Sequence, residues 1–374
     1  MTNPLHRLHD SGQSIWLDYI DRTMLRDGEL QRRIEQDALT GMTSNPTIFE
    51  KAMAEGTAYD AQLSSAPRGL TAWDVFELVE TDDVRAACDI FRPIYDRTHG
   101  ADGFVSIEVS PGAANDAEAT VEEAHRLRDM VDRPNVMIKV PGTTQGALAT
   151  RRLISDGVNV NITLLFAREA YADIIEAYFA GLESRVRAGK PIDGIASVAS
   201  FFVSRVDTEA DKRIDAKRRE ASGDVARRLD ALHGRIAVAN AKLAYALFRE
   251  RFAGRRWEAL AAKGARLQRP LWASTSTKNP AYRDVMYVED LIGPDTVNTM
   301  PPATIEAFRD HGVVARTVDT RLDEERATLA ELESLGISLG SITEKLLVDG
   351  LASFQKSFDT LIARLEEKRE AVRR

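Results

Sequence analysis

The chain carries the sequence NVMIKVPGT at residues 135–143, an apolar run rich in β-branched residues with one lysine near its end. Such residues favour strands and a Pro-Gly pair favours a turn, so we predict a buried strand that stops at this turn. Lys139 is costly there, because taking an ammonium out of water favours the neutral amine. A neutral amine is what a Schiff-base nucleophile requires. The alternative is a structural lysine whose head group reaches solvent past the strand end.

Apolar, strand-like runs recur along the chain and alternate with longer helical patterns. Residues 167–188 and 236–252 repeat apolar side chains every three or four positions, as an amphipathic helix does. Eight strands alternating with helices predict an α/β fold, a (β/α)8 TIM barrel. A doubly wound open sheet is the competing topology, but no glycine-rich phosphate loop follows the first strand. The predicted strands are residues 15–20, 41–46, 104–109, 135–141, 158–164, 195–203, 270–275 and 296–301.

The remaining segments fit one domain built on this barrel. We predict a single domain over residues 1–374, with 302–374 as C-terminal helices packed on the barrel. Within that tail, 323–333 and 341–366 have amphipathic helical patterns. The charge-rich stretch 206–235 is interpreted as a solvated, helical insertion after the sixth strand.

Composition narrows the classes of function. The 374 residues carry a net charge of −8 with both signs interspersed, which argues against a nucleic-acid surface. The single cysteine, Cys88, excludes an intrachain disulfide, and no apolar run reaches the roughly 18 residues of a membrane span. No signal-peptide pattern opens the chain, so we expect a cytoplasmic protein. The histidines lack metal-ligand spacing and the dinucleotide and P-loop motifs are missing, so we expect neither metal nor organic cofactor.

Polar residues cluster at the carboxyl ends of the predicted strands, where the active sites of barrels lie. Each has a structural alternative: Asp18 as a helix cap, Asn45 as a turn residue, Glu108 as half of an ion pair. The set as a whole is harder to explain structurally, because unpaired buried polar groups are expensive. Its members are Asp18, Asn45, Glu108, Lys139, Asn161, Thr163, Ser200, Arg205, Ser274 and Lys278.

Three blocks of sequence resemble the transaldolase family. TSNPTI at 43–48 is similar to the family's T-[ST]-N-P motif, and IKVP at 138–141, with the Thr, Gln and Gly that follow, is similar to its Schiff-base lysine segment. GVNVNITLLF at 157–166 resembles the next strand of the family. The similarity extends over roughly residues 12–310. WAST at 272–275 and TVNTMP at 296–301 look like the longer bacterial branch.

The resemblance implies roles for the residues nearest the lysine. Lys139 would form a covalent imine, and Asp18 would take the proton of the substrate C4 hydroxyl as the C3–C4 bond breaks. Glu108 and Thr163 would hold and activate a catalytic water. The donor hydroxyls would be bound by Asn45 and Asn161.

The resemblance also implies a phosphate site at the other end of the substrate. SFFVSR at 200–205 is similar to the family's S-P-F-V-G-R, with Phe and Ser in place of Pro and Gly, and it retains Arg205. Lys278 stands where much of the family has arginine, and lysine offers phosphate a point charge without the bidentate fork. Either Ser274 or Ser276 would contact the phosphate, and Ser200 and Phe202 would border the substrate.

The function implied is a transaldolase of the pentose phosphate pathway, without cofactor, as a monomer or homodimer. It would transfer dihydroxyacetone from sedoheptulose 7-phosphate to glyceraldehyde 3-phosphate, giving erythrose 4-phosphate and fructose 6-phosphate. The nearest alternative is a class I aldolase that releases dihydroxyacetone; related aldolases have tyrosine where this chain has Phe202, whose ring offers no hydroxyl. A catalytically silent sugar-phosphate binder is the alternative from another class, and it predicts loss of the lysine or its carboxylates.

Overall fold

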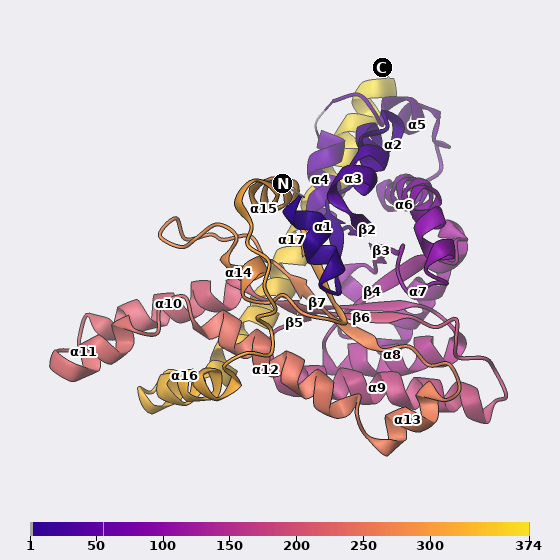
Figure 1. Cartoon of the computed structure of the whole chain (residues 1–374). Coiled ribbons are helices and arrows are strands. Elements are labelled where there is room, and N and C mark those ends of the chain that lie inside the picture. The colour runs from indigo at the N-terminus through magenta and orange to yellow at the C-terminus, as the bar shows by residue number, and fades with distance from the viewer. Residues whose placement is uncertain (1–2, 55, 374) are drawn as a thin grey trace.

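The computed structural model describes residues 3–54 and 56–373. Its eight strands are parallel neighbours in chain order, and β1 pairs with β8 from Gln13–Thr296 to Leu17–Met300, which closes the barrel (Figure 1). The predicted (β/α)8 barrel is confirmed. The strands are β1 Gln13–Asp18, β2 Leu39–Thr43, β3 Val105–Glu108, β4 Val136–Pro141, β5 Val160–Leu165, β6 Ser197–Phe202, β7 Gln268–Ala273 and β8 Thr296–Met300.

Helices follow each strand and form the outer layer. Short or additional helices lie between several strands, so that β2 is followed by three helices and β6 by four. The helices up to β6 are α1 Pro4–Asp10, α2 Arg22–Arg26, α3 Glu29–Asp37, α4 Pro46–Ala54, α5 Asp60–Ser65, α6 Ala72–Arg97, the 3₁₀ turn η1 Pro111–Ala113, α7 Ala117–Val131, α8 Thr144–Asp156 and α9 Arg168–Arg187. Those after β6 are α10 Ser204–Arg218, α11 Gly223–Asp230, α12 Ile236–Arg251, α13 Arg255–Ala261, α14 Met286–Glu289, α15 Pro302–His311, α16 Leu322–Ser334 and α17 Leu339–Arg373.

The segment after Lys139 turns sharply because of one glycine. Thr143 caps α8 by accepting a hydrogen bond from the backbone N–H of Gly146 at 2.9 Å. A Cβ atom on Gly146 would lie 1.8 Å from the carbonyl oxygen of Pro141, so only glycine lets α8 start directly against the end of β4. The start of α8 is therefore packed directly against Pro141, the last residue of β4, which follows Lys139 by two positions.

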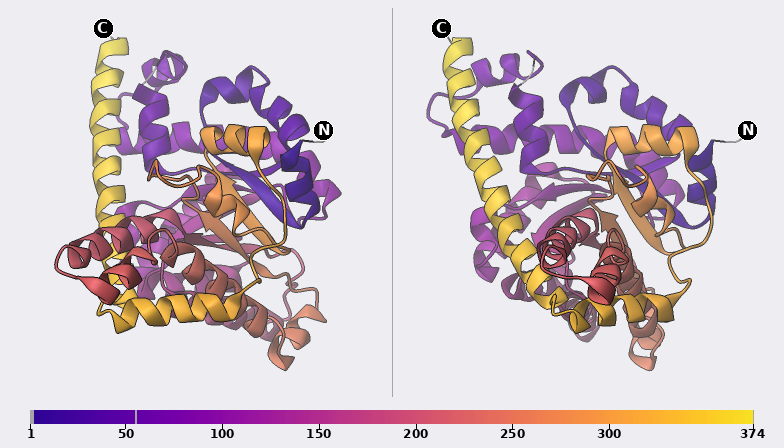
Figure 2. Two further views of the ribbon diagram at one scale, coloured as in Figure 1. Left: turned by 60° about the vertical axis from the view of Figure 1, so that its left-hand side comes forward. Right: turned by 90° about the vertical axis from the view of Figure 1, so that its left-hand side faces the viewer.

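The predicted helical insertion and C-terminal helices are present. The stretch 206–235 includes α11 and all but the first two residues of α10, and the predicted segments 323–333 and 341–366 correspond to α16 and α17. α17 is longer than its pattern predicted and runs along one side of the molecule, past α10 and then beside α4 and α5 (Figure 2). Among the described residues, no helix is long and apolar enough to cross a membrane.

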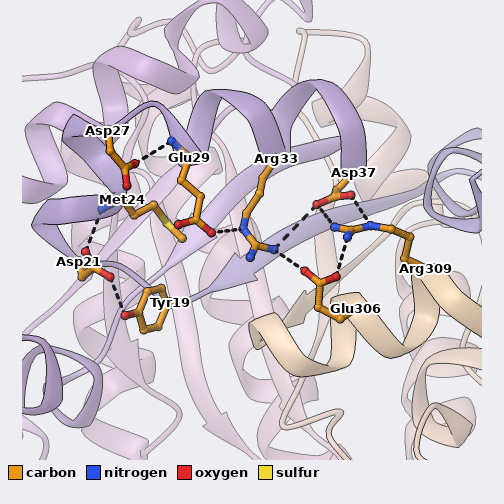
Figure 3. Close-up of polar contacts among 9 residues, drawn as sticks. All are labelled: Tyr19, Asp21, Met24, Asp27, Glu29, Arg33, Asp37, Glu306 and Arg309. Atoms are coloured by element: carbon orange, nitrogen blue, oxygen red, sulfur yellow. Dashed lines mark hydrogen bonds and ion pairs between the residues drawn. The ribbon is translucent and has the colours of Figure 1, made fainter.

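Charged side chains join α3, which precedes β2, to α15, which follows β8 (Figure 3). Arg33 on α3 contacts Glu29 at 2.9 Å and Glu306 on α15 at 3.1 Å. Arg309 on α15 donates two hydrogen bonds to Asp37 at the end of α3, at 2.8 and 2.5 Å. The β1–β8 seam is therefore bridged twice: by the pairing of the two strands within the sheet, and by ion pairs between α3 and α15 outside it.

Candidate active site

Lys139 lies near the carboxyl end of β4, inside the barrel. The residue is 5% exposed, and its Nζ donates to the Glu108 Oε2 atom and to the backbone oxygen of Ser44, both at 2.9 Å. The head group therefore does not escape to solvent past β4. The register of the sheet sets this pairing, because Glu108 on β3 and Asn161 on β5 are the direct neighbours of Lys139 on β4.

Asp18 lies across the barrel from this strand, at the end of β1. Its Oδ1 accepts a hydrogen bond from Thr43 Oγ1 at 2.7 Å, and that hydroxyl also lies 2.7 Å from the hydroxyl of Thr299. Burial raises the pKa of the Asp18 carboxyl, and the charge of Lys139 is the largest influence that opposes the rise. Asp18 is therefore a carboxyl with one fixed partner and with part of its surface open to the cavity.

Glu108 differs from Asp18 in its surroundings. It is buried, and burial raises its pKa, opposed mainly by the charge of Lys139 and the hydrogen bond from it. It does not line the cavity, whereas Lys139 does. The arrangement places Glu108 behind the amine, where it can exchange a proton with it, and Asp18 beside the space in front.

Asn161 is held within a row of buried hydrogen bonds. Its amide nitrogen donates to Ser106 Oγ at 2.9 Å, and its Oδ1 accepts from Ser200 Oγ at 2.7 Å. Asn161 does not line the cavity, whereas Ser200 does. Asn161 therefore orients the hydroxyl of Ser200 through this hydrogen bond.

Thr163 follows Asn161 on the same face of β5 and lines the cavity. Its hydroxyl oxygen is buried and has no protein hydrogen-bond partner in the described part of the chain. The next residue, Leu164, has a left-handed backbone with φ of 59°, and the pairing of β5 with β6 shifts register there. A buried unpaired hydroxyl is expensive, and this one belongs to a residue that lines the same cavity as Lys139.

Asn45 caps the helix that follows it and also lies in the cavity wall. Its Oδ1 accepts from the backbone N–H of Ile48 at 3.1 Å, which caps the start of α4, as a turn residue would. The residue is also part of the cavity wall.

Cationic and hydroxyl side chains gather at the other side of the cavity. Arg205, in the first turn of α10, lies over the ring of Phe202, with its guanidinium carbon 5.2 Å from the ring centre. Burial lowers the pKa of Arg205, and the charge of Asp18 opposes that change. Lys278 Nζ donates to Ser276 Oγ at 2.7 Å, and Ser274, with φ of 56°, contacts Ser204 through its hydroxyl. All of these except Ser204 line the cavity. Arginine and lysine beside serine hydroxyls are suited to a phosphate group.

The cavity has a volume of about 430 Å³ at the carboxyl ends of the strands. All of the predicted site residues line this cavity except Glu108 and Asn161, which lie behind its wall. It also contains residues that sequence reasoning missed. Thr43 and Thr299 could have been found from their strand ends, but Lys51 on α4 and Phe354 on α17 have no local signal. The missed lining residues are Tyr19, Thr43, Thr47, Ile48, Lys51, Ala273, Thr299, Pro301, Pro302 and Phe354.

A known family accounts for this combination of barrel and lysine. A family model described as Transaldolase/Fructose-6-phosphate aldolase matches residues 15–365. The chain belongs to the transaldolase family. Proteins named Transaldolase are similar along almost their whole length: that of Trichodesmium erythraeum (strain IMS101) is 46% identical over 98% of both chains, and that of Thermobifida fusca (strain YX) is 47% identical over 98% of this chain and 99% of its own. Transaldolase 1 of Streptomyces avermitilis is 48% identical, covering 96% of this chain and 93% of its own.

Membership in the transaldolase family confirms the resemblance seen in the sequence, and it makes the chain an enzyme of this transferase family. The three blocks that carried the resemblance lie at the β2–α4 junction, on β4 and on β5. Within the described ranges, no group of three or more His, Cys, Asp or Glu side chains is arranged to hold a metal ion.

Proposed function

We propose that the chain is a transaldolase that transfers a dihydroxyacetone unit between sugar phosphates through an imine on Lys139. The single observation that carries this proposal is the buried Nζ of Lys139 at the cavity, 2.9 Å from a carboxylate that can take its proton. The substrates proposed are sedoheptulose 7-phosphate and glyceraldehyde 3-phosphate, giving erythrose 4-phosphate and fructose 6-phosphate, as in the pentose phosphate pathway.

The first half of the reaction begins with the free amine of Lys139. The amine attacks the C2 ketone of the donor, and loss of water gives an iminium ion. Asp18 takes the proton of the C4 hydroxyl, the C3–C4 bond breaks, and its electron pair moves toward the iminium nitrogen. An aldose phosphate leaves, and the three-carbon unit stays on Lys139 as an enamine.

The second half reverses these steps on another aldehyde. The enamine carbon adds to the acceptor carbonyl, whose oxygen receives the proton from Asp18, and water then hydrolyses the imine. Glu108, hydrogen-bonded to the amine, is the group proposed to move protons during imine formation and hydrolysis. The unpaired hydroxyl of Thr163 would hold the water, since its oxygen has no protein partner among the described residues.

The other end of the cavity supports a phosphate-bearing substrate. Arg205 and Lys278 supply positive charge, and Ser274 and Ser276 supply hydroxyls beside them. We propose that these four side chains bind the phosphate and that Ser200 and Asn45 contact donor hydroxyls. Asn161 would act on the donor through the Ser200 hydroxyl that it fixes.

The alternative within the family is an aldolase that releases dihydroxyacetone to water. Phe202 favours transfer, because a phenyl ring at this wall of the cavity supplies no hydroxyl to protonate the enamine. With that protonation slow, the enamine persists until an acceptor aldehyde arrives.

Borohydride trapping with fructose 6-phosphate, followed by peptide mass spectrometry, tests the proposal. We expect a reduced three-carbon adduct on Lys139. Lys242 serves as an internal control, because it is another buried lysine, paired with Glu325 at 3.1 Å, and its peptide should stay unlabelled. Folded protein without an adduct, or with the label elsewhere, would overturn the imine. Product analysis with erythrose 4-phosphate then separates transfer from aldolysis, because only transfer makes sedoheptulose 7-phosphate without free dihydroxyacetone.

A further inference from the structure

The loop that carries Lys278 connects β7 to α14 and is ordered by its own hydrogen bonds. Thr277 donates its hydroxyl to the backbone oxygens of Arg283 and Asp284, at 3.1 and 3.0 Å. The side chain of Asn279 accepts from the N–H of Ala281 at 2.9 Å. These bonds join residues 277–284 into one hydrogen-bonded unit that includes Lys278.

The middle of this loop is attached to α10 by Tyr282. Its hydroxyl donates to Asp211 Oδ2 at 2.6 Å, while Asp211 Oδ1 accepts from the N–H of Gly234 at 3.1 Å. Gly234 has φ of 67°, and a Cβ atom there would lie 2.8 Å from the tyrosine ring. The Asp211 carboxylate therefore binds the hydroxyl of Tyr282, and Gly234 leaves room for its ring.

The same helix carries the other proposed phosphate ligand. Arg205 lies in the first turn of α10 and Asp211 lies further along it, within a helix that spans Ser204–Arg218. Because helix and loop are each ordered, the Tyr282–Asp211 bond, together with the bond from Tyr287 to Asp207, links the segment that carries Lys278 to the helix that carries Arg205. Burial and the Asp211 carboxylate raise the pKa of Tyr282, so its hydroxyl keeps the proton that it donates.

A second cavity, of about 330 Å³, lies between the loop and α10. Because of this space, the loop is not held against α10 by close packing alone. Lys278 borders this second cavity as well as the active-site cavity. The second cavity is also lined by Asp207 and Asp211. A loop without its attachment would have room to move Lys278 away from the active site.

We propose that Tyr282, through its hydrogen bond to Asp211, is a positioning residue that holds Lys278 at the phosphate end of the active site. The inference rests on the proposed function and deepens it by naming what fixes the phosphate specificity. Lysine needs such support more than arginine does, because a single ammonium has no planar fork to align itself on a phosphate.

Steady-state kinetics of Tyr282→Phe test the inference, because phenylalanine keeps the ring on Gly234 and removes only the hydroxyl. We expect KM for fructose 6-phosphate to rise roughly tenfold, with kcat little changed, since one hydrogen bond to a charged group is lost. KM for unphosphorylated fructose should stay the same. Tyr245→Phe is the matched control: it loses a bond to the Pro294 carbonyl before β8, at the other end of the barrel, and should alter neither KM.

The same substitution in a Lys278→Ala background shows whether Tyr282 acts through the lysine. We expect no further rise in KM there, because the group that Tyr282 positions has already been removed. An equal rise in both backgrounds, an equal rise for fructose, or no rise at all would overturn the inference. Wild-type protein that forms no adduct on Lys139 would instead overturn the proposed function, so the two failures are distinguishable.

Discussion

Asp18 and Glu108 are two carboxyl groups near one amine; Asp18 is partly open to the cavity and Glu108 is buried, and their hydrogen-bond partners differ. Burial raises the pKa of both, and the charge of Lys139 opposes the rise in both. Asp18 borders the cavity and accepts from Thr43, whereas Glu108 lies behind the cavity wall and accepts from Lys139 itself. Unlike surroundings of this kind are how one site can hold an acid and a base at the same pH.

Replacing Asp18 by Asn should slow carbon–carbon bond cleavage while leaving imine formation intact. We expect kcat to fall by about 10²–10⁴-fold, the usual contribution of a positioned general base. The carboxylate form takes the proton and its pKa is raised above the ordinary 3.8, so the wild-type rate should fall as pH drops through that raised pKa. The variant should lose this acid limb. Rapid-quench kinetics across pH, with adduct trapping, measure both effects, and unchanged turnover would remove Asp18 from proton transfer.

At the scale of elements, the charge network between α3 and α15 stabilises the seam where the barrel closes (Figure 3). Asp37 is fully buried and receives both of its side-chain hydrogen bonds from Arg309, which is about one-third exposed. The nearest other cation is Arg33, at 3.9 Å. Removing Arg309 would leave the buried Asp37 carboxylate without its two hydrogen bonds. This loss lowers the free energy of unfolding more than the loss of an exposed ion pair does.

Arg309→Ala should therefore lower the free energy of unfolding by about 1–3 kcal/mol, a range that allows for the partial exposure of the arginine. Arg326→Ala is the matched control, because its pair with Asp323 on α16 is exposed on both sides and should contribute less than about 0.5 kcal/mol. Urea unfolding of the two variants gives the comparison. Equal effects would mean that the seam network is no stronger than a surface ion pair.

At the scale of the whole molecule, α17 ties separate parts of the barrel wall together (Figure 2). It packs against α4, α5, α6 and α10, and Phe354 from its middle lines the active-site cavity. Leu361 and Leu365 are each 1% exposed. We predict that this helix and the barrel form one cooperative domain.

Leu361→Ala should lower the stability of the whole chain by about 2–4 kcal/mol through the cavity that it leaves. In urea, circular dichroism should report the helices. Fluorescence of protein in which Trp73, which packs on Phe358 of α17, and Trp257 are replaced by Phe should report Trp16 and Trp272, which are buried in the barrel strands. We expect both signals to shift together. Val348→Ala, at a site 61% exposed on α17, should shift neither. A separate, earlier transition seen only by circular dichroism would show that α17 unfolds alone.

Much of the site was predictable because strand ends in a barrel converge. Lys139, Asp18, Thr163, Ser200 and Arg205 were found from polar residues at the ends of apolar runs, and all five line one cavity. The orientation of Asn161 was not predictable, because its burial behind Ser200 depends on hydrogen bonds between neighbouring strands. Predicted strand ends also differed from the observed ones by a few residues, as between 158–164 and β5 at Val160–Leu165.

The sequence by itself determined the alternation of strands and helices, the strand that carries Lys139, and the family. These follow from local patterns, since periodicity, β-branching and glycine positions act over a few neighbouring residues. The tertiary structure alone decided which distant segments complete the site. Thr47 contacts Ser357, which lies 310 positions later in the chain, and Phe354 of α17 lines the cavity. Tyr282 likewise contacts Asp211 and Gly234. Such contacts depend on how whole helices pack, and no short stretch of sequence contains that information.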